Sequence, residues 1–109
     1  MKAYDTSIMS DELPDQLVKV LTDITDKELM CSFLRDVMTE KEILEISARL
    51  EAAKMLVRKQ PYTAITQRTK LSSRTVARIS DWLQNGCGGY GSIISGTHHA
   101  HLSPELTDS

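Results

Sequence analysis

Basic and hydroxyl side chains gather between residues 61 and 84, in a stretch that has the pattern of two short helices around a tight turn. Pro61 suits the start of the first helix, because the first helical residue needs no partner for a backbone N–H. The turn is expected at residues 69–71 and carries Lys70, although turns of this kind often contain glycine. The Ser72 hydroxyl can accept a free backbone N–H and so begin the second helix.

The second helix of this pair has an inward face and a polar outward face. Val76, Ile79 and Leu83 recur at helical spacing and are expected to face inward, as are Tyr62 and Ile65 on the first helix. A helix presented by its N-terminal residues fits the major groove of DNA. The alternative is an ordinary pair of packed helices with a solvated polar face. The residues that we expect to bind DNA are Arg68, Lys70, Ser72, Ser73, Arg74, Thr75, Ala77 and Arg78.

Charged residues are unevenly distributed along the chain, which as a whole is mildly acidic with a formal net charge of −2. Residues 1–40 contain nine acidic side chains against four basic ones. Residues 52–80 contain no Asp or Glu and seven basic side chains, namely Lys54, Arg58, Lys59, Arg68, Lys70, Arg74 and Arg78. This segregation produces a local positive field, and its coincidence with the two-helix pattern favours a nucleic-acid surface over a merely solvated face.

The length and composition are those of one soluble domain, with 109 residues of which 40% are hydrophobic and 26% charged. No apolar run approaches the roughly 20 residues of a membrane span, and the N-terminus lacks the layout of a signal peptide. Cys31 and Cys87 form no CxxC motif and are expected to be reduced thiols, with Cys31 buried. We therefore expect a cytoplasmic location and no membrane partner.

Helical patterns also precede the basic segment, and no strand pattern occurs. An apolar stripe over residues 17–24 predicts a first helix. Two capping-box pairs predict the starts of a second and a third helix, at Thr25 with Glu28 and at Thr39 with Glu42. The sequence therefore predicts an all-α fold of five helices or slightly more.

The expected organisation is a single all-helical domain over residues 1–91 and a flexible tail over residues 92–109. Within the domain, residues 12–58 are the expected dimerisation helices and residues 61–84 the helix-turn-helix. The early helices have more apolar surface than a small helix-turn-helix can cover. The remaining apolar surface belongs either to a larger monomer core or to a dimer interface, and we favour a homodimer. A symmetric dimer would place two recognition helices about 34 Å apart, one turn of double-stranded DNA.

A glycine-rich loop follows Asn85, and Gly86 is expected to end the last helix in the left-handed conformation. A loop that cradles phosphate would need a following helix N-terminus or a Lys/Ser pair, and the sequence predicts neither. His98, His99 and His101 lie in the expected tail, where they lack the rigid scaffold of a metal site. We therefore predict no metal and no cofactor.

Three motifs between residues 38 and 90 occur in an order and spacing that is similar to a known family. They are the Thr39-Glu40 helix start, the Ala48-Arg49-Leu50 run and the Gly88-Gly89-Tyr90 end. In these motifs the chain resembles the Trp repressor-like family of short bacterial regulators, and most of all its YerC/YecD branch. The resemblance implies an intertwined, all-helical homodimer that binds double-stranded DNA through the helix beginning at Ser72.

The resemblance also implies roles for single residues on the DNA-binding side. Ser73, Arg74 and Ala77 match the positions that face base edges in the Trp repressor. Arg68 and Lys70 lie where contacts to the DNA backbone would be useful.

Four further residues match the wall of the tryptophan pocket in that family, namely Arg49, Arg78, Ile79 and Trp82. Ile79 stands where the repressor has a glycine and Trp82 where it has a serine, so larger side chains would occupy the space of a free tryptophan. We therefore expect no tryptophan binding, and the sequence does not reveal whether another small molecule controls the protein. Arg49 and Arg78 are then either pocket residues or surface arginines that neutralise phosphates.

The leading interpretation is a cytoplasmic, dimeric, sequence-specific DNA-binding transcriptional regulator. The alternative is a protein-interaction module that keeps the helix-turn-helix as a scaffold without binding DNA. An enzyme is not expected, because the only histidines lie in the expected tail and neither cysteine has a basic partner close in sequence.

Overall fold

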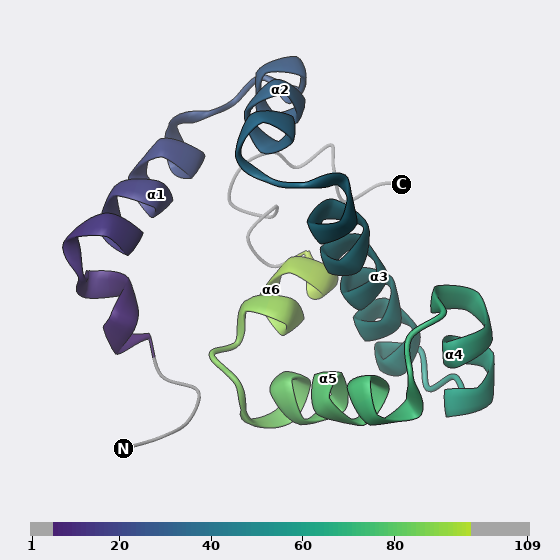
Figure 1. Ribbon diagram of the computed structural model, residues 1–109. Helices are drawn as coiled ribbons and strands as arrows, with labels where there is room; N and C mark the ends of the chain where they lie inside the picture. The colour runs from purple at the N-terminus through teal and green to yellow at the C-terminus, as the bar shows by residue number, and fades with distance from the viewer. Residues whose placement is uncertain (1–5, 97–109) are drawn as a thin grey trace. The chain divides into compact units, whose positions relative to one another are not determined.

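The computed structural model describes residues 6–96, which are almost entirely helical (Figure 1). The elements are η1, a 3-10 helix at Ser7–Ser10, and the α-helices α1 Glu12–Asp23, α2 Lys27–Val37, α3 Glu40–Val57, α4 Tyr62–Thr69, α5 Ser73–Asn85 and α6 Gly89–Ser95. No strand occurs within the described residues, so the all-α prediction is confirmed. The helix beyond the predicted five is α6, which follows the glycine-rich loop.

The start of α3 is fixed by the predicted capping box. The backbone N–H of Thr39 donates to the Glu42 carboxylate at 2.8 Å, and the Thr39 hydroxyl accepts the Glu42 N–H at 3.1 Å. Each residue thus satisfies a backbone donor that the helix itself leaves without a partner. Glu40 and Glu42 also place negative charge in the first turn, where it interacts favourably with the helix dipole.

The start of α2 differs from the prediction, which paired Thr25 with Glu28. The helix begins at Lys27, and Asp26 is the capping residue. The Asp26 carboxylate accepts the backbone N–H of Leu29 at 2.9 Å. An ionised carboxylate is a stronger acceptor than a hydroxyl, which explains why Asp26 caps this helix in place of the preceding Thr25.

The chain divides into two units, and the border falls inside α3 between Ile46 and Ser47. We call them the N-terminal unit, with η1, α1, α2 and the first turns of α3, and the C-terminal unit, with the rest of α3 and α4 to α6. Among the described residues, every fully buried side chain belongs to the C-terminal unit. The prediction of one domain over residues 1–91 stays a prediction.

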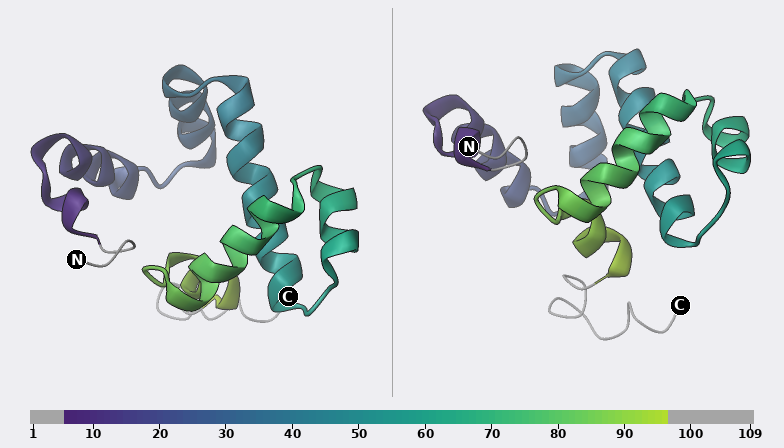
Figure 2. Two further views of the ribbon diagram at one scale, coloured as in Figure 1. Left: turned by 60° about the horizontal axis from the view of Figure 1, so that its bottom comes forward. Right: turned by 90° about the horizontal axis from the view of Figure 1, so that it is seen from below.

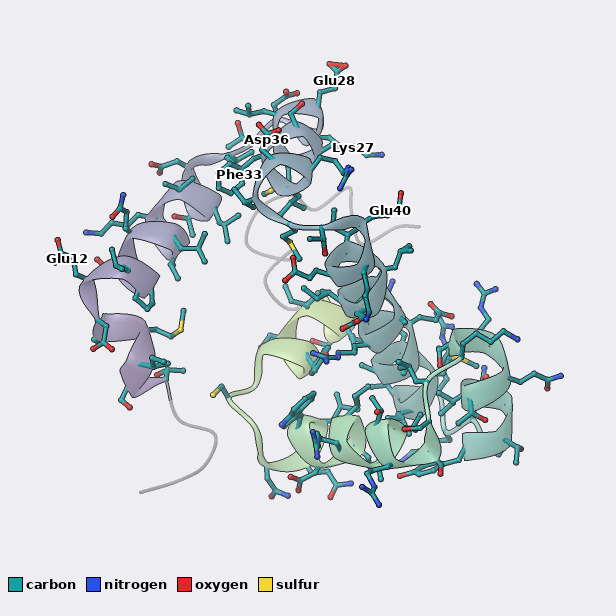
Figure 3. The ribbon with its side chains drawn as sticks, viewed as in Figure 1. Glu12, Lys27, Glu28, Phe33, Asp36 and Glu40 are labelled. Carbon is teal, nitrogen blue, oxygen red and sulfur yellow. The ribbon has the colours of Figure 1, made fainter. Side chains whose placement is uncertain are left out.

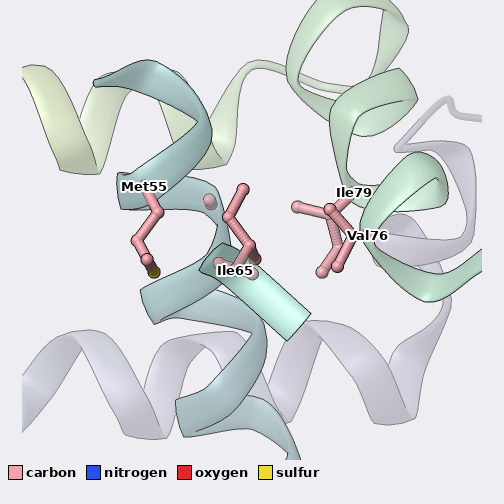
Figure 4. Packing of buried hydrophobic residues seen from close by; sticks show 6 residues of the cluster. Met55, Ile65, Val76 and Ile79 are labelled. Atoms are coloured by element: carbon pink, nitrogen blue, oxygen red, sulfur yellow. The ribbon is translucent and has the colours of Figure 1, made fainter. Parts of the chain in front are cut away.

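The core of the C-terminal unit is formed by aliphatic side chains from α3, α4 and α5. Figure 4 shows Met55, Ile65, Val76 and Ile79 converging, and Ala52 and Ala53 complete the buried set. Burying an aliphatic side chain of this size contributes about 1.5–3 kcal/mol, so this cluster holds α5 firmly against α3 and α4. Partly buried side chains surround the cluster, namely Leu56, Ala64, Leu71, Trp82, Leu83, Tyr90 and Ile94.

The N-terminal unit has the opposite character, because α1 and α2 bury none of their residues. Its exposed large hydrophobic residues are Ile8, Met9, Leu13, Leu17, Val18, Val20, Leu29, Val37, Leu44 and Ile46. An apolar groove of about 370 Å³ runs between α1 and α2 and is lined by Leu13, Gln16, Leu17, Val20 and Phe33. Acidic side chains such as Glu12 and Glu28 project outward from the same helices (Figure 3).

Cys31 on α2 is exposed, so its predicted burial is wrong. The prediction relied on the usual burial of small thiol side chains. That preference requires a second element to cover the helix face. No residue of α2 is buried in the described structure, and Leu29 and Val37 on the same helix are exposed as well.

Candidate nucleic-acid interface

The helix-turn-helix consists of α4, the turn at residues 70–72 and α5, and the two helices lie beside each other in both views of Figure 2. Pro61 immediately precedes α4 with a φ of −72°, close to the value that its ring favours. Ile65 is fully buried, as predicted. The predicted inward position of Tyr62 is wrong, because this side chain is 40% exposed. Tyr62 is the first residue of α4, three positions before Ile65.

The turn is held by hydrogen bonds and contains no glycine. Lys70 ends α4 in the left-handed conformation, with φ 65° and ψ 11°, and its N–H donates to the Thr66 carbonyl at 2.9 Å. The Thr69 hydroxyl donates to the Ile65 carbonyl at 2.7 Å and accepts the Leu71 N–H at 3.2 Å. The Leu71 side chain packs against the core from within the turn. These contacts fix the direction in which α5 begins.

Ser72 caps α5, as predicted. Its hydroxyl accepts the backbone N–H of Thr75 at 3.1 Å and donates to the Thr75 hydroxyl at 3.1 Å. Thr75 is half-buried, whereas Ser72 remains exposed. The two hydroxyls at the start of α5 are therefore engaged with each other.

The outward face of α5 carries most of the predicted DNA-binding set. Val76 and Ile79 are fully buried, and helical geometry then directs the neighbouring positions away from the core. Apart from half-buried Thr75, the whole set is exposed, namely Arg68, Lys70, Ser72, Ser73, Arg74, Ala77 and Arg78. The C-terminal unit thus brings the predicted residues together around one helix start and its preceding turn.

Arg68 on α4 lies near a carboxylate of another helix. Its Nε lies 3.6 Å from Oε2 of Glu51 on α3. The pair joins two helices of the C-terminal unit, but both side chains reach solvent, so the interaction is screened. Glu51 lies directly before the acid-free segment of residues 52–80.

The four predicted pocket residues have different environments. Ile79 is fully buried, and Trp82 is half-buried against the core. Arg49 is half-buried and Arg78 is exposed. Burial raises the pKa of the Tyr90 hydroxyl above its ordinary 10.0, and the positive charge of Arg49 partly opposes this effect. The charge of Arg49 therefore acts on Tyr90 of α6, an interaction that the sequence pattern did not indicate.

The glycine-rich loop differs from its predicted form. Gly86 has a φ of −82° and is not left-handed. Close packing requires glycine at position 86 instead, because a Cβ there would collide with the carbonyl oxygen of Trp82. Gly88 is the left-handed residue, with a φ of 87°, and it lets the chain turn into α6.

The predicted absence of a helix after the loop is also wrong, since α6 occupies Gly89–Ser95. Tyr90 and Ile94 lie four residues apart and pack against the core, and this apolar pair stabilises a short helix that its glycine residues did not suggest. The predicted tail over residues 92–109 therefore begins too early. His98, His99 and His101 lie outside the described residues.

Two further properties concern residues 6–96. None of their helices combines the length and the apolar character that crossing a membrane requires. The same residues hold no group of three or more His, Cys, Asp or Glu side chains placed to bind a metal ion. The chemistry at the start of α5 is that of cations and hydroxyls, which can contact phosphates and base edges.

Comparisons with protein-family models, curated proteins and solved structures all find similarity to Trp repressor-like proteins or to YerC. The family model described as Trp repressor protein matches residues 12–98. The uncharacterized protein YerC of Bacillus subtilis is 33% identical over 76 residues, which cover 70% of this chain and 73% of YerC. A crystal structure of a TrpR-like protein from Eubacterium eligens has a TM-score of 0.78 and 30% identity, covering 84% of this chain and 94% of that chain. A candidate Trp repressor from Staphylococcus aureus has a TM-score of 0.79 and 26% identity, covering 88% and 96%.

Proposed function

Because the chain belongs to the Trp repressor-like family, in its YerC branch, we propose that it is a sequence-specific DNA-binding transcriptional regulator. The observation that carries the proposal is the exposed N-terminal face of α5. Ser73, Arg74 and Ala77 are exposed there, while the opposite face of the helix is buried in the core. A rigidly held helix with this presentation fits the major groove, where an arginine can read the edge of guanine.

Electrostatics support the same proposal. The exposed cations Arg68 and Lys70 lie on α4 and in the turn, beside the helix that would enter the groove. Such residues contact phosphates and set the register of the protein on the duplex. The acid-free segment of residues 52–80 attracts the DNA backbone, while the acidic N-terminal residues keep the whole chain close to neutral.

The proposed regulator is a cytoplasmic homodimer that pairs through its N-terminal unit. The supporting observation is the apolar surface of α1 and α2, which carries exposed leucines such as Leu13 at 73% and Leu29 at 55%. A symmetric partner that covers these faces would remove them from water. The same symmetry would supply two recognition helices, one for each half of a two-fold operator.

The proposed regulator does not respond to tryptophan. Ile79 is fully buried and Trp82 packs against the core, so both large side chains belong to the protein's own packing. Isothermal calorimetry with L-tryptophan tests this point. We expect no heat of binding. Saturable binding at micromolar concentration would refute the proposal that Ile79 and Trp82 fill the tryptophan pocket.

Selection of bound duplexes from a random pool tests the main proposal. The selected duplex should then bind in a salt series with an affinity that falls steeply, because each neutralised phosphate contributes about −0.9 to the slope of log K against log salt. Enrichment of duplexes with a two-fold symmetric sequence would support DNA binding by a dimer. The absence of salt-sensitive affinity for any duplex would favour the second candidate, a protein-interaction module whose apolar groove between α1 and α2 docks a partner.

A further inference from the structure

Left-handed backbone occurs at four of the described residues, and they fall into two kinds. Gly88 and Gly96 flank α6, with φ of 87° and 76°. Lys59 and Lys70 follow α3 and α4, both with φ of 65°. Glycine adopts this conformation freely, whereas a residue with a Cβ is strained there. The chain therefore uses glycine at the C-terminal positions and lysine at the two turns around α4.

Both lysines occupy the position after a helix at which glycine is the usual residue. At the end of α3, the Lys59 N–H donates to the Leu56 carbonyl at 2.9 Å and the Gln60 N–H donates to the Met55 carbonyl at 3.0 Å. These two hydrogen bonds together form the Schellman motif, which requires a left-handed residue. At the end of α4, the corresponding contact is the single hydrogen bond from the Lys70 N–H to the Thr66 carbonyl. Both lysine side chains are exposed.

The helix dipole does not explain this choice. A cation near a helix C-terminus is favourable, but it can lie on unstrained helical backbone within the last turn. The structure already has such cations, with Lys54 in the last turn of α3 and Arg68 in that of α4. A lysine at the left-handed position adds strain that glycine would remove. What it adds in return is an ammonium group that extends from each turn into solvent.

We propose that Lys59 is a DNA-backbone contact and that it acts together with Lys70 at the two turns that flank α4. The inference rests on the proposed function and extends the interface to the turn between α3 and α4. The eight residues of α4 span about 12 Å, so two long side chains at its ends can contact separate phosphates. Strain is kept at these turns because the side chains bind DNA.

The test compares glycine variants of the full chain by thermal unfolding and by binding to a mixed-sequence duplex. Lys59→Gly and Lys70→Gly should each raise the melting temperature, since the strain is relieved. Each should also weaken duplex binding several-fold and reduce the salt slope by about 1. Lys59→Arg keeps the cation and should retain the affinity. Lys27→Gln removes an exposed cation from α2 and should leave the salt slope unchanged.

The outcomes separate this inference from the function on which it rests. If Lys59→Gly binds the duplex as the unmodified chain does, this inference is wrong and the DNA-binding proposal stands. A lower melting temperature for Lys59→Gly would also overturn it, because the lysine would then stabilise the fold itself. If the unmodified chain shows no salt-sensitive affinity for the duplex, both proposals fail.

Discussion

The Arg68 guanidinium on α4 lies 3.6 Å from the Glu51 carboxylate on α3, so one cation of the proposed DNA surface already faces an anion within its own chain. The side chains of Arg68 and Glu51 are 68% and 34% exposed. An ion pair this accessible to water contributes about 0–1 kcal/mol to stability. Its larger effect is on the local field, because Glu51 reduces the attraction between Arg68 and a phosphate.

Replacing Glu51 with glutamine should therefore strengthen DNA binding. Glu51→Gln removes the negative charge and is expected to raise duplex affinity several-fold and steepen its salt dependence, while the free energy of unfolding changes by at most about 1 kcal/mol. Fluorescence anisotropy over a salt series measures the first effect and urea unfolding the second. Glu45→Gln is the matched control on α3, with an exposed side chain in the N-terminal unit. Unchanged or weaker binding by Glu51→Gln would contradict a phosphate contact at Arg68.

Arg74 is the side chain most directly placed to read bases. Arg74→Ala should cost about 1–3 kcal/mol of binding free energy and relax the preference at one base pair if Arg74 contacts a base edge. A phosphate contact would instead weaken binding to all sequences alike. Gel-shift titrations over selected and single-substituted duplexes distinguish the two. Arg35→Ala removes an exposed arginine from α2 as a control, and equal losses for both variants would argue against any reading role for Arg74.

The apolar surface of α2 should be required for dimerisation. Leu29 is 55% exposed in the single chain, and a carboxylate at that position could not be buried against a partner without a large desolvation penalty. Leu29→Glu is therefore expected to yield monomers in sedimentation equilibrium while circular dichroism retains the helical signal. Ser32→Glu adds the same charge at an exposed position of the same helix. A Leu29→Glu chain that sediments as the unmodified chain does would place any dimer interface elsewhere.

Ile79 should be essential to the stability of the C-terminal unit. It is fully buried between helices, and Ile79→Ala is expected to lower the free energy of unfolding by about 2–5 kcal/mol through lost burial and the cavity left behind. Ile93 is 49% exposed, and Ile93→Ala should change stability far less. Thermal and urea unfolding measure both. Similar losses of unfolding free energy for the two variants would contradict the greater contribution of Ile79 to the core.

Tyr90 should make stability depend on alkaline pH. Burial favours its neutral phenol, so its pKa in the folded state lies above the ordinary 10.0 of the unfolded chain. The stabilisation is fully present below the unfolded pKa and is lost as pH rises through the folded pKa, because the unfolded state ionises first. Urea unfolding between about pH 9 and pH 11 should show a steeper loss for the unmodified chain than for Tyr90→Phe.

Arg49 provides a second check on this titration. Its positive charge lowers the pKa of Tyr90, so Arg49→Met should raise that pKa further. Ultraviolet absorbance of the phenolate, taken as the difference from the same chain carrying Tyr90→Phe, follows the shift. A pKa that does not move would mean that the Arg49 charge does not reach the Tyr90 hydroxyl.

The sequence by itself determined the features that depend on neighbours within about four residues. The capping box of Thr39 with Glu42 and the cap at Ser72 formed as expected, because each satisfies backbone donors of its own first turn. The inward positions of Ile65, Val76 and Ile79 followed from helical periodicity for the same reason. These local rules were sufficient to predict an all-α fold and the exposed face of α5.

The tertiary structure alone decided the features that depend on distant partners. Tyr62 and Cys31 are exposed because no described element covers them, although their residue types favour burial. The Arg68–Glu51 ion pair joins residues 17 positions apart, and the charge of Arg49 affects the pKa of Tyr90 from 41 positions away, separations that no local pattern encodes. Helix α6 likewise depends on Tyr90 and Ile94 packing on a core built by other helices, since a helix of seven residues has little stability of its own.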